Sequence, residues 1–434
     1  MDTKKNIVVI GGGFGGFGGF GGLATVQGLK TADAEITLID KRNHHLFQPL
    51  LYQVATAGLA ATDIAWPIRS ILAKQLNARV VLGNVVDIQL PEKKVITENK
   101  EYEYDHLVVA TGARHSYFGE DQLESFAPGL KRIIDATEIR KRVLLAFECA
   151  ETASTADAQS RHLTFFIVGG GPTGVEVAGA IAELANQALT KEFRSIDPGS
   201  ARIILVEGMD RLLKAFPEKQ SAYAKEALEK LGVEVILNQR VTIDGHEGVI
   251  IDGKKIPAST KIWAAGVQVP DVAKWLNIET DPSGRIPVGD DLSVAGQPDV
   301  YVIGDAANVP WKEGSVPGIA PAAKQAGKHV AKSLHAKLGT GNAPKAFKYS
   351  HKGNLATIGR NSAVVDFGKI QFAGRFAWWL WGVAHIYFLI GVRAPMIVAT
   401  QWFWSYLTFG KGARLITGVM PLFKKHETTD GEDV

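Results

Sequence analysis

Two segments of the sequence share one pattern, and this repetition constrains the fold more than any other feature. Residues 6–40 and 163–208 each read as a β-branched strand, a glycine-rich turn, a helix of small residues and a second strand that ends in an acid. Such a βαβ unit binds the pyrophosphate of a dinucleotide at its turn. We therefore expect an α/β protein with two nucleotide sites rather than two purely structural turns.

The three glycines of each turn have separate tasks. The first allows a tight turn, the second lets the backbone approach the pyrophosphate, and the third lets the helix pack closely on the strand. The phosphates then meet the unpaired N–H groups at the start of the helix. The second unit supplies Gly169, Gly171 and Gly174, and the first unit, counted from its strand, supplies Gly11, Gly13 and Gly16.

The acids at the ends of the two units, Asp40 and Glu207, indicate which nucleotide is used. A carboxylate accepts hydrogen bonds from a ribose 2′-hydroxyl and repels a 2′-phosphate. The pattern therefore favours NADH over NADPH at the nicotinamide site, although Arg211 nearby weakens this exclusion. The alternative for Glu207 is a solvated charge at the end of a strand.

The first turn is longer than the dinucleotide motif expects. Residues 11–23 read GGGFGGFGGFGGL, and Gly11 stands 29 positions before Asp40, where about 20 are usual. Counted from the helix, the three places fall on Phe17, Gly19 and Gly22 instead. Either the extra residues loop out or extend the start of the helix, or they disrupt the pyrophosphate cradle and weaken the binding of its cofactor.

Shorter stretches indicate further strands. Residues 80–89, 93–113 and 254–267 alternate like small antiparallel strands, and two of them end in the similar phrases ATG (110–112) and AAG (264–266). Residues 298–310 read as a buried strand that ends in Gly304-Asp305. Asp305 either caps a helix or binds the ribityl or phosphate region of a cofactor.

Composition narrows the class of protein. A length of 434 residues predicts two or three domains. The 48 Lys and Arg against 45 Asp and Glu are too balanced to indicate a nucleic-acid partner. The single cysteine, Cys149, excludes an internal disulfide, a CxxC redox pair and a Cys-rich zinc site, and we expect no metal. No targeting peptide is visible, so we expect the chain to stay in the cytoplasm.

Together these features resemble the two-dinucleotide-binding-domain flavoproteins, in which an NAD domain is inserted into a FAD domain. The resemblance implies a FAD domain over 1–120 and 285–340, an NADH domain over 160–275 and a C-terminal segment over 341–434. The implied FAD contacts are Gly11, Gly13, Gly16, Asp40, Lys41, Val85, Thr111, Gly112 and Asp305. The implied NADH contacts are Gly169, Gly171, Gly174, Glu207 and Gly266.

Two stretches are similar to the type II NADH:quinone oxidoreductases in particular. Residues 41–59, KRNHHLFQPLLYQVATAGL, contain an F-x-P-L-L-Y segment that this family carries near the flavin. Glu176, two residues after the third glycine, matches a glutamate at the nicotinamide and quinone end of the flavin. Without the match, Glu176 reads as a first-turn acid that the helix macrodipole stabilises.

A third stretch, GIAPAAKQAGKHVA at 318–331, resembles the quinone-site motif AQxAxQ of the same family. Ala320, Ala323 and Gln325 match the motif, and Pro321 replaces its first glutamine. The resemblance therefore implies that Ala320, Ala323 and Gln325 contact the quinone. The alternative for Gln325 is an exposed polar residue on a helix.

Aromatic residues gather near the C-terminus, where 372–409 hold five of the nine tryptophans. Arg393 separates two runs, 377–392 and 394–410, and neither reaches the roughly 20 apolar residues of a transmembrane helix. On a helix, Thr400, Gln401, Ser405, Thr408 and Lys411 fall on one face, and Met396, Val398, Trp402, Phe403, Tyr406 and Phe409 lie mostly opposite. The basic flank Lys411, Arg414, Lys424 and Lys425 favours a helix on the lipid surface over a buried dimer interface.

The resemblance implies a peripheral enzyme on the cytoplasmic face of the cell membrane, most simply a homodimer, that contacts lipid through residues 372–425. It would oxidise NADH, transfer hydride to FAD and reduce a membrane quinone without pumping ions, with Glu176 and Gln325 as catalytic residues. One alternative is a soluble NADH-dependent flavin reductase of a protein electron carrier. The long first turn motivates another, a FAD-deficient NADH-binding sensor or interaction protein.

Overall fold

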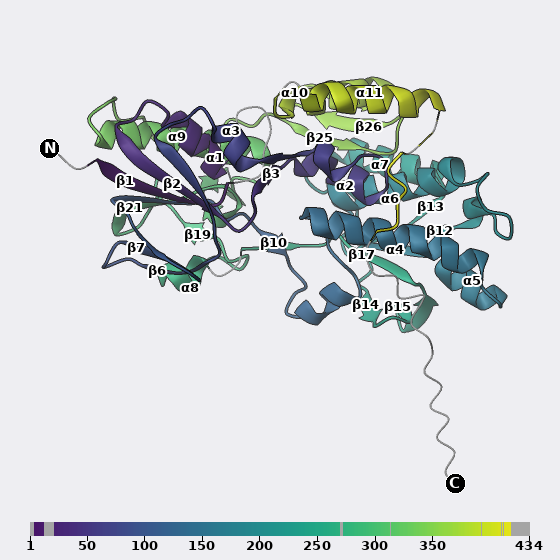
Figure 1. Cartoon of the computed structure of the whole chain (residues 1–434). Coiled ribbons are helices and arrows are strands. Elements are labelled where there is room, and N and C mark those ends of the chain that lie inside the picture. The colour runs from purple at the N-terminus through teal and green to yellow at the C-terminus, as the bar shows by residue number, and fades with distance from the viewer. Residues whose placement is uncertain are drawn as a thin grey trace, which may run out of the picture.

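The computed structural model describes residues 4–12, 21–269, 272–312, 314–391, 393–408, 410 and 412–417. Two sheets, one parallel and one parallel except for its edge strand β20, form two lobes of the molecule, and the C-terminal helices lie across the top (Figure 1). Several residues of the sequence-based predictions lie outside the described ranges, namely Gly13, Gly16, Phe17, Gly19, Phe409, Lys411, Lys424 and Lys425.

The first sheet has six strands in the order β20-β21-β9-β1-β2-β5. They are β1 (Lys5–Ile10), β2 (Ala34–Asp40), β5 (Ala78–Leu82), β9 (His106–Val109), β20 (Ser293–Val294) and β21 (Gln297–Val302). β21 pairs in parallel with β9, with Val300 opposite Leu107, although most of the second lobe separates them in sequence. The first domain is therefore assembled from two parts of the chain, as expected for a split FAD domain.

The second sheet has four strands in the order β13-β12-β11-β17. They are β11 (Thr164–Val168), β12 (Arg202–Glu207), β13 (Val233–Leu237) and β17 (Thr260–Trp263), and all pair in parallel. All five residues of β11 are buried, as is typical of a parallel strand that is covered on both faces. The predicted α/β class with two Rossmann-like domains is confirmed.

The prediction of small antiparallel strands is only partly right. Three-stranded antiparallel sheets do form from β6 (Val85–Gln89), β7 (Lys94–Thr97) and β8 (Glu101–Glu103), and from β14 (Thr242–Asp244), β15 (Gly248–Ile251) and β16 (Lys254–Pro257). In contrast, β9 and β17 are parallel members of the two large sheets. The ATG and AAG phrases follow these two strands, at the carboxyl edge where α/β sheets bind ligands.

The helices and the remaining short strands connect and cover the sheets. The helices of the two lobes are α1 (Gly21–Gly28), α2 (Leu51–Ala55), α3 (Ile68–Leu72), α4 (Ile133–Glu151), α5 (Ala156–His162), α6 (Pro172–Glu183), α7 (Glu218–Lys230), α8 (Val272–Leu276) and α9 (Ala320–Lys337). The two-stranded pairs are β3 (His44–Leu46) with β4 (Ala65–Pro67), β10 (Arg114–His115) with β18 (Val267–Gln268), β19 (Ile286–Pro287) with β22 (Ala307–Asn308), and β23 (Pro310–Trp311) with β24 (Gly314–Ser315). The β10–β18 pair joins the two chain segments that cross between the lobes.

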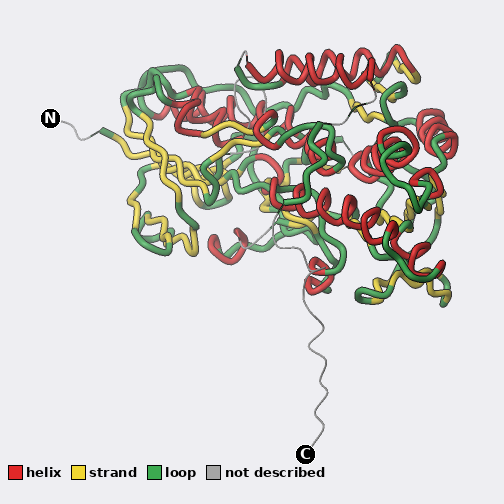
Figure 2. Tube along the Cα trace, turned by 45° about the vertical axis from the view of Figure 1, so that its right-hand side comes forward, coloured by secondary structure: helices red, strands yellow, loops and turns green. Residues whose placement is uncertain are grey.

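The C-terminal part consists of an antiparallel sheet and two helices. The sheet contains β25 (Asn354–Thr357), β26 (Ala363–Asp366) and β27 (Gln371–Gly374), and the helices are α10 (Arg375–Phe388) and α11 (Arg393–Thr408). Figure 2 shows a long helix lying along the edge of the molecule rather than projecting from it. No helix in the described ranges is both long and apolar enough to cross a membrane.

The predicted division of α11 into a polar and an apolar face is wrong. Val398 is buried, and Trp402 and Tyr406 line an internal cavity, whereas Met396 and Phe403 are exposed. Ser405, predicted on the polar face, also lines this cavity. The helix packs on the protein through a mixed face, and its outward face is apolar as well, so a two-face division of the sequence cannot describe it.

Candidate functional site

The turn of the first βαβ unit keeps both ends of the dinucleotide motif. Gly11 has a φ of +95°, and Gly169, its counterpart in the second unit, has a φ of +110°. A Cβ at Gly22 would lie 2.0 Å from the carbonyl oxygen of Gly11, and a Cβ at Gly174 would lie 1.8 Å from that of Gly169. Gly22 therefore takes the helix-packing place of the third glycine. The first motif glycine is therefore Gly11, as counting from the strand predicts, and the third is Gly22, as counting from the helix predicts.

A cavity of about 550 Å³ opens beside this turn. Its lining includes Gly11, Asp40, Lys41, Val85 and Thr111, all of them predicted FAD contacts, together with Arg42, Lys274 and Trp275. The carboxylate of Asp40 accepts hydrogen bonds from the backbone N–H of Gly12 (2.6 Å) and of Arg42 (2.8 Å), which fixes it at the end of β2.

The walls of this cavity fit the adenosine and pyrophosphate of FAD. The buried hydroxyl of Thr111 has no hydrogen-bond partner among the described residues, so it remains available to a ligand. A Cβ at the neighbouring Gly112 would meet open space. Together with the close helix packing at Gly22, these observations support a cofactor site at the described ends of the turn.

The second unit forms an open nucleotide cradle. Gly171 caps the start of α6, Pro172 occupies the first turn, and a Cβ at Gly171 would meet nothing within 4 Å. The N-terminus of α6 therefore presents free N–H groups to a phosphate. Gly266 has a φ of +73° in the loop after β17, where a Cβ would come within 2.9 Å of the ring of Phe118.

Glu207 is positioned by the backbone and is not a loose surface charge. Its carboxylate accepts hydrogen bonds from the N–H groups of Gly170 (2.6 Å) and Met209 (2.9 Å), as Asp40 does in the first unit. Arg211, which weakened the argument against NADPH, donates instead to the carbonyl of Phe216 (2.7 Å) and the hydroxyl of Ser221 (2.8 Å). The geometry thus favours a ribose with a free 2′-hydroxyl.

Asp305 lies at the carboxyl edge of the first sheet, in a short 3-10 turn over Gly304–Ala306. No side chain caps this turn, so the helix-cap alternative for Asp305 finds no support. Its carboxylate lies 4.0 Å from the ammonium group of Lys131, whose carbonyl accepts a hydrogen bond from Gln48 (2.9 Å). Gln48 belongs to the F-x-P-L-L-Y segment, so this segment does reach the predicted flavin end of the cofactor site.

Glu176 is buried in the second turn of α6, so the alternative of a first-turn acid is wrong. Burial raises its pKa to about 8, and the distant backbone N–H of Thr357 (3.5 Å) offsets this only in part. Its neighbour Tyr52 is also buried, and burial together with the charge of Glu176 raises the pKa of Tyr52 well above 10. At neutral pH both groups are therefore protonated and able to donate.

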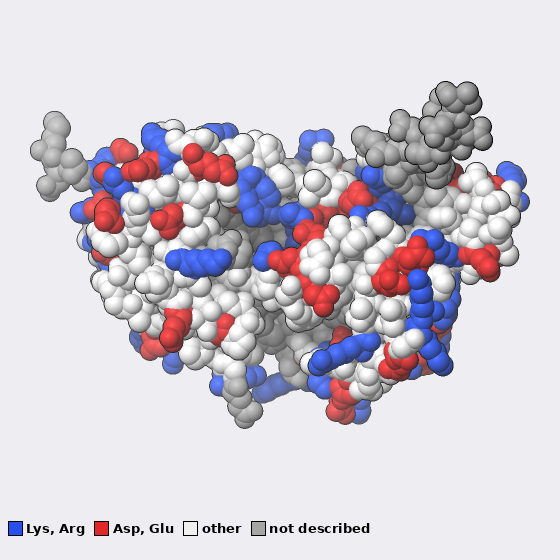
Figure 3. All heavy atoms as spheres, turned by 90° about the horizontal axis from the view of Figure 1, so that it is seen from below, with Lys and Arg blue, Asp and Glu red and all other residues white. Residues whose placement is uncertain are grey.

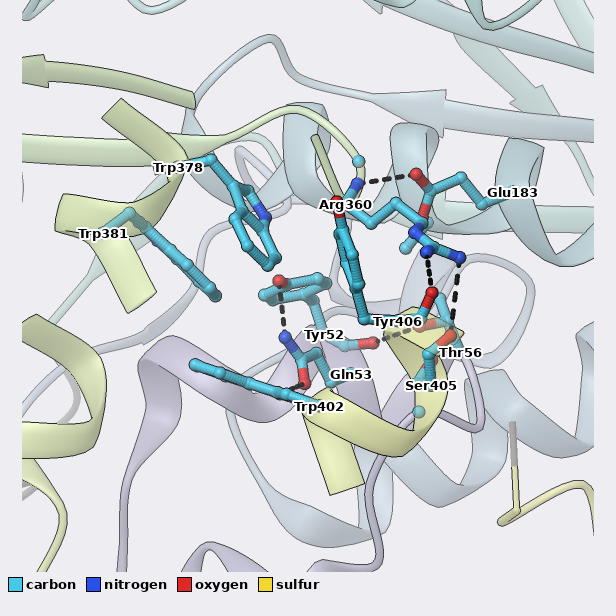
Figure 4. Close-up of a pocket in the computed structure, with 13 residues that line it drawn as sticks. Tyr52, Gln53, Thr56, Glu183, Arg360, Trp378, Trp381, Trp402, Ser405 and Tyr406 are labelled. Carbon is cyan, nitrogen blue, oxygen red and sulfur yellow. Dashed lines mark hydrogen bonds between the residues drawn. The ribbon is translucent and has the colours of Figure 1, made fainter. Parts of the chain in front are cut away.

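A second cavity, which we call the aromatic cavity, lies between α2, α6 and the C-terminal helices (Figure 4). Its volume is about 90 Å³, the space of several waters at about 10–15 Å³ each. It lies along α6 from Glu176, one turn away at Ala180 and two turns away at Glu183. The lining consists of Tyr52, Gln53, Thr56, Gly58, Ala180, Glu183, Gly359, Arg360, Trp378, Trp381, Trp402, Ser405 and Tyr406.

Arg360 fixes the C-terminal end of α11 against this cavity. Its guanidinium group donates to the carbonyls of Ser405 (3.4 Å) and Tyr406 and lies over the ring of Tyr406, 4.8 Å from its centre. These carbonyls belong to the last turn of the helix, where a cation is favourable. The backbone N–H of Arg360 donates to Glu183 (2.6 Å), which ties the same loop to α6.

The residues of the predicted quinone motif do not line the aromatic cavity. Ala323 on α9 approaches Gly304 and so lies at the flavin end. The side-chain amide of Gln325 donates to the carbonyl of Ser350 (2.9 Å) and accepts from its N–H (2.9 Å). In this conformation Gln325 holds the 350 loop against α9, and both of its amide groups are engaged.

Several residues of the site were missed by the sequence analysis. Tyr52 and Gln53 stand in a segment that was recognised, but nothing in the pattern marked their side chains. Glu183 follows Glu176 by two helical turns on the same face, a spacing that would have pointed to it. Arg360 stands alone in a loop, and no local pattern predicts its role.

Charged side chains are mixed over the face seen from below in Figure 3, where blue and red atoms alternate and a hollow lies between the two lobes. A nucleic-acid site would require a continuous basic stripe. This face therefore agrees with the balanced charge of the sequence.

Comparison with known proteins gives matches over nearly the whole chain. A family model described as pyridine nucleotide-disulphide oxidoreductase matches residues 5–327, and one described as NDH2 C-terminal domain matches residues 351–410. The type II NADH:quinone oxidoreductase Ndh of Mycobacterium tuberculosis is 42% identical over 95% of this chain and 90% of its own length. The type II NADH:quinone oxidoreductase of Staphylococcus aureus is 30% identical over 86% of this chain and 92% of its own.

Among solved structures, the fold resembles NDH2 from Plasmodium falciparum in complex with NADH. The TM-score is 0.85, and the match covers 96% of this chain and 100% of the other. The sequence identity is 21%, so this likeness speaks for the fold alone.

Proposed function

The chain belongs to the type II NADH:quinone oxidoreductases, and from this premise we propose where its quinone binds and how its C-terminal helices meet the membrane. It oxidises NADH and reduces a quinone with FAD as its cofactor, without pumping ions. This activity replaces the two alternatives, a reductase of a protein electron carrier and a FAD-deficient sensor.

We propose that the residues of the two cradles hold the two nucleotides. Asp40, Lys41, Val85 and Thr111 hold the adenosine part of FAD, as their place around the first cavity supports. Asp305 binds the ribityl region. Gly13 and Gly16, in the glycine-rich turn, stay predicted FAD contacts. FAD held there would supply the redox chemistry that links hydride transfer from NADH to two-electron reduction of the quinone. Gly171 and Glu207 hold NADH, as the open end of α6 and the fixed carboxylate support.

The quinone head group occupies the aromatic cavity and arrives from the side of the C-terminal helices. The observation that carries this proposal is the lining, in which Trp378, Trp381 and Trp402 from the C-terminal helices meet Tyr52 and Ala180 from the nucleotide-binding lobes. Flat apolar walls with few polar groups suit a planar ring that bears two carbonyls. Ala320 and Ala323 of α9 do not line this cavity and stay quinone contacts predicted from the motif alone, and Gln325 supports α9.

Glu176 supplies a proton to the quinone. The overall reaction converts NADH, one proton and a quinone into NAD⁺ and a quinol, so one proton must come from outside the nicotinamide. A carboxyl with a pKa of about 8 carries this proton at neutral pH. Its position beside Tyr52, one helical turn from the cavity lining, supports a proton relay over a purely structural role.

The outward face of α10 and α11 lies in the membrane surface. Phe376, Trp379, Val383 and Tyr387 of α10 are each at least 60% exposed and recur at intervals of three and four residues, which places them on one face. Met396, Phe403, Trp404 and Leu407 extend this apolar face on α11. The two helices begin with the exposed arginines Arg375 and Arg393. The helix macrodipole disfavours a cation at this end, but the phosphates of a lipid surface attract one.

Two further predictions concern the assembly and its location. A homodimer and attachment to the cytoplasmic face of the cell membrane stay predictions from the sequence. Contact with lipid through the apolar face requires neither.

A cavity-filling substitution tests the quinone site. Ser405→Leu adds apolar volume to the wall of the aromatic cavity, so we expect the KM for a short-chain benzoquinone to rise about 10-fold or more, by analogy with overpacking costs of about 1–3 kcal/mol. Reduction of ferricyanide by NADH, which needs no quinone site, should stay unchanged. Thr400→Leu, on an exposed turn of the same helix, is the matched control. An unaltered quinone KM in Ser405→Leu would place the quinone elsewhere.

A further inference from the structure

We propose that the hydroxyl of Tyr52 donates a hydrogen bond to a carbonyl oxygen of the quinone, and that Trp402 and Gln53 fix the direction of this bond. The inference rests on the proposed function, because it takes the quinone head group as the occupant of the aromatic cavity. It assigns a positioning role to two side chains that do not themselves react.

The direction begins at Trp402, whose indole nitrogen can only donate. This N–H donates to Oε1 of Gln53 over 2.7 Å. The amide oxygen of Gln53 is therefore turned toward the indole, and its NH₂ group points away from it. If the oxygen and nitrogen of the Gln53 amide were exchanged, its NH₂ group would face the N–H of Trp402, and two donors would meet. The indole N–H of Trp402 therefore fixes the orientation of the amide.

The NH₂ group of Gln53 meets Tyr52. Its Nε2 donates to the Tyr52 hydroxyl oxygen over 2.8 Å, and Figure 4 shows these two bonds in series from Trp402 through Gln53 to Tyr52. Among the described residues this is the only side-chain hydrogen bond of the Tyr52 hydroxyl, and the hydroxyl is the acceptor in it. A phenol has one proton to donate. The proton of Tyr52 is therefore left for another acceptor, and Tyr52 lines the cavity.

The surroundings of Tyr52 specify the kind of acceptor. The side chain is only 7% exposed, so its hydroxyl bonds to whatever occupies the cavity rather than to bulk water. The stacked indoles of Trp381 and Trp402, 5.2 Å apart, together with Trp378, present flat apolar surfaces. A planar ring that carries an oxygen acceptor satisfies both demands, and a quinone is such a ring.

The bond would assist the reaction as well as the binding. As the quinone takes up electrons, negative charge grows on its carbonyl oxygen, and a hydrogen bond to that oxygen becomes stronger. Because the donor is already directed by Gln53 before the quinone arrives, little reorganisation is needed at that moment. Truncation of the donor should therefore lower kcat as well as raise KM.

Tyr52→Phe tests the inference, because it removes the donor and keeps the ring. We expect kcat/KM for a short-chain benzoquinone to fall about 10-fold, the effect of one hydrogen bond. The carbonyl stretch of the bound, isotope-labelled quinone should move to higher frequency in infrared difference spectra. The rate at which NADH bleaches the flavin, and the reduction of ferricyanide, should not change. Tyr104→Phe is the matched control, since Tyr104 is also buried and its hydroxyl has no partner among the described residues.

Gln53→Leu separates direction from donation. This variant keeps the proton of Tyr52 but removes the group that turns it toward the cavity, so we expect a smaller loss of quinone kcat/KM, about 3-fold. A larger loss in Gln53→Leu than in Tyr52→Phe would contradict the assignment of Tyr52 as the donor and Gln53 as the residue that orients it.

The outcomes distinguish the inference from the function on which it rests. If Ser405→Leu raises the quinone KM but Tyr52→Phe changes neither kcat/KM nor the carbonyl frequency, the cavity site stands and the hydrogen bond is refuted. If Tyr52→Phe slows ferricyanide and quinone reduction equally, Tyr52 is merely structural and the inference also fails. If neither Ser405→Leu nor Tyr52→Phe affects the quinone, the proposed site fails and the inference falls with it.

Discussion

Replacement of Glu176 by glutamine tests how strongly burial controls the carboxyl that we assign to proton transfer. In the unfolded chain this carboxyl has its ordinary pKa of 4.5, and in the folded protein burial raises the pKa to about 8. The folded state therefore binds the proton more tightly than the unfolded state does. By linkage, the free energy of unfolding must fall as the pH rises between these two values.

The size of the effect follows from the same two values. Below pH 4.5 the carboxyl is protonated in both states and costs nothing, and above about pH 8 it is ionised in both, so the cost stays constant. Between these limits the difference amounts to about 5 kcal/mol, at about 1.4 kcal/mol for each pKa unit. Glutamine cannot ionise, so Glu176→Gln should lack this decline.

The assay is urea unfolding of the FAD-loaded protein at pH 5, 7 and 9, with wild type and Glu176→Gln compared at each pH. The advantage of the variant should grow by about 3 kcal/mol between pH 5 and pH 7 and by less between pH 7 and pH 9. Glu148→Gln, on the exposed side of α4, is the control and should show no such trend. A constant difference between wild type and Glu176→Gln across this range would refute the burial argument and, with it, the proton donor.

The other predictions concern the cradles and the membrane. Gly22→Ala should weaken FAD retention, at a cost of about 1–3 kcal/mol, because its Cβ would clash with the carbonyl of Gly11. Gly314→Ala, where an added Cβ meets open space, should retain FAD. Equal flavin content in the two variants would contradict this expectation. Glu207→Ala should raise the ratio of NADPH to NADH in kcat/KM about 10-fold or more, since we propose that the carboxylate faces the 2′ position, and an unchanged ratio would place that position elsewhere. The double change of Phe403 and Trp404 to serine should weaken binding to anionic vesicles about 30-fold in flotation assays, while Leu76→Ser, at an even more exposed position on the first lobe, should not. Full vesicle binding by the double variant would indicate that α11 faces something other than lipid.

The fold could be predicted from the sequence where local signals and long-range packing agree. The two βαβ units carry their own turn and acid, so Asp40 and Glu207 lie where the pattern predicts, at the ends of β2 and β12. The strand that precedes Gly304-Asp305 was also predicted, and it joins the first sheet as β21.

The remaining parts of the site depend on contacts that the sequence does not encode locally. The long first turn offered two sets of glycines. Only the structure shows that a Cβ at Gly22 would clash with the carbonyl of Gly11, which identifies Gly22 as the glycine at the helix contact. Gln325 matched a motif, but its bond to Ser350 depends on a loop whose path no periodicity predicts. Arg360 stands in the loop between β25 and β26, and the packing of this sheet on α6 and α7 brings it to the end of α11.

The division of α11 failed for a different physical reason. The outward face of α11 is apolar as well as its packed face, so hydrophobicity alone cannot tell which tryptophan faces inward. Trp402 bonds to Gln53 and is held in the cavity, whereas Trp404 is 63% exposed. The signal that separates them is the hydrogen-bond partner, which only the structure supplies.

The central claim is that this chain carries electrons from NADH through its bound flavin to a quinone, and an anaerobic absorbance experiment tests it most directly. Purified full-length protein should show a flavin band that bleaches when NADH is added and returns when a short-chain benzoquinone follows, with a much slower return in Ser405→Leu. A folded protein that was offered FAD yet shows no flavin band would indicate that the long glycine turn does not hold the cofactor. A band that NADH bleaches but quinone does not restore would contradict the quinone half of the account.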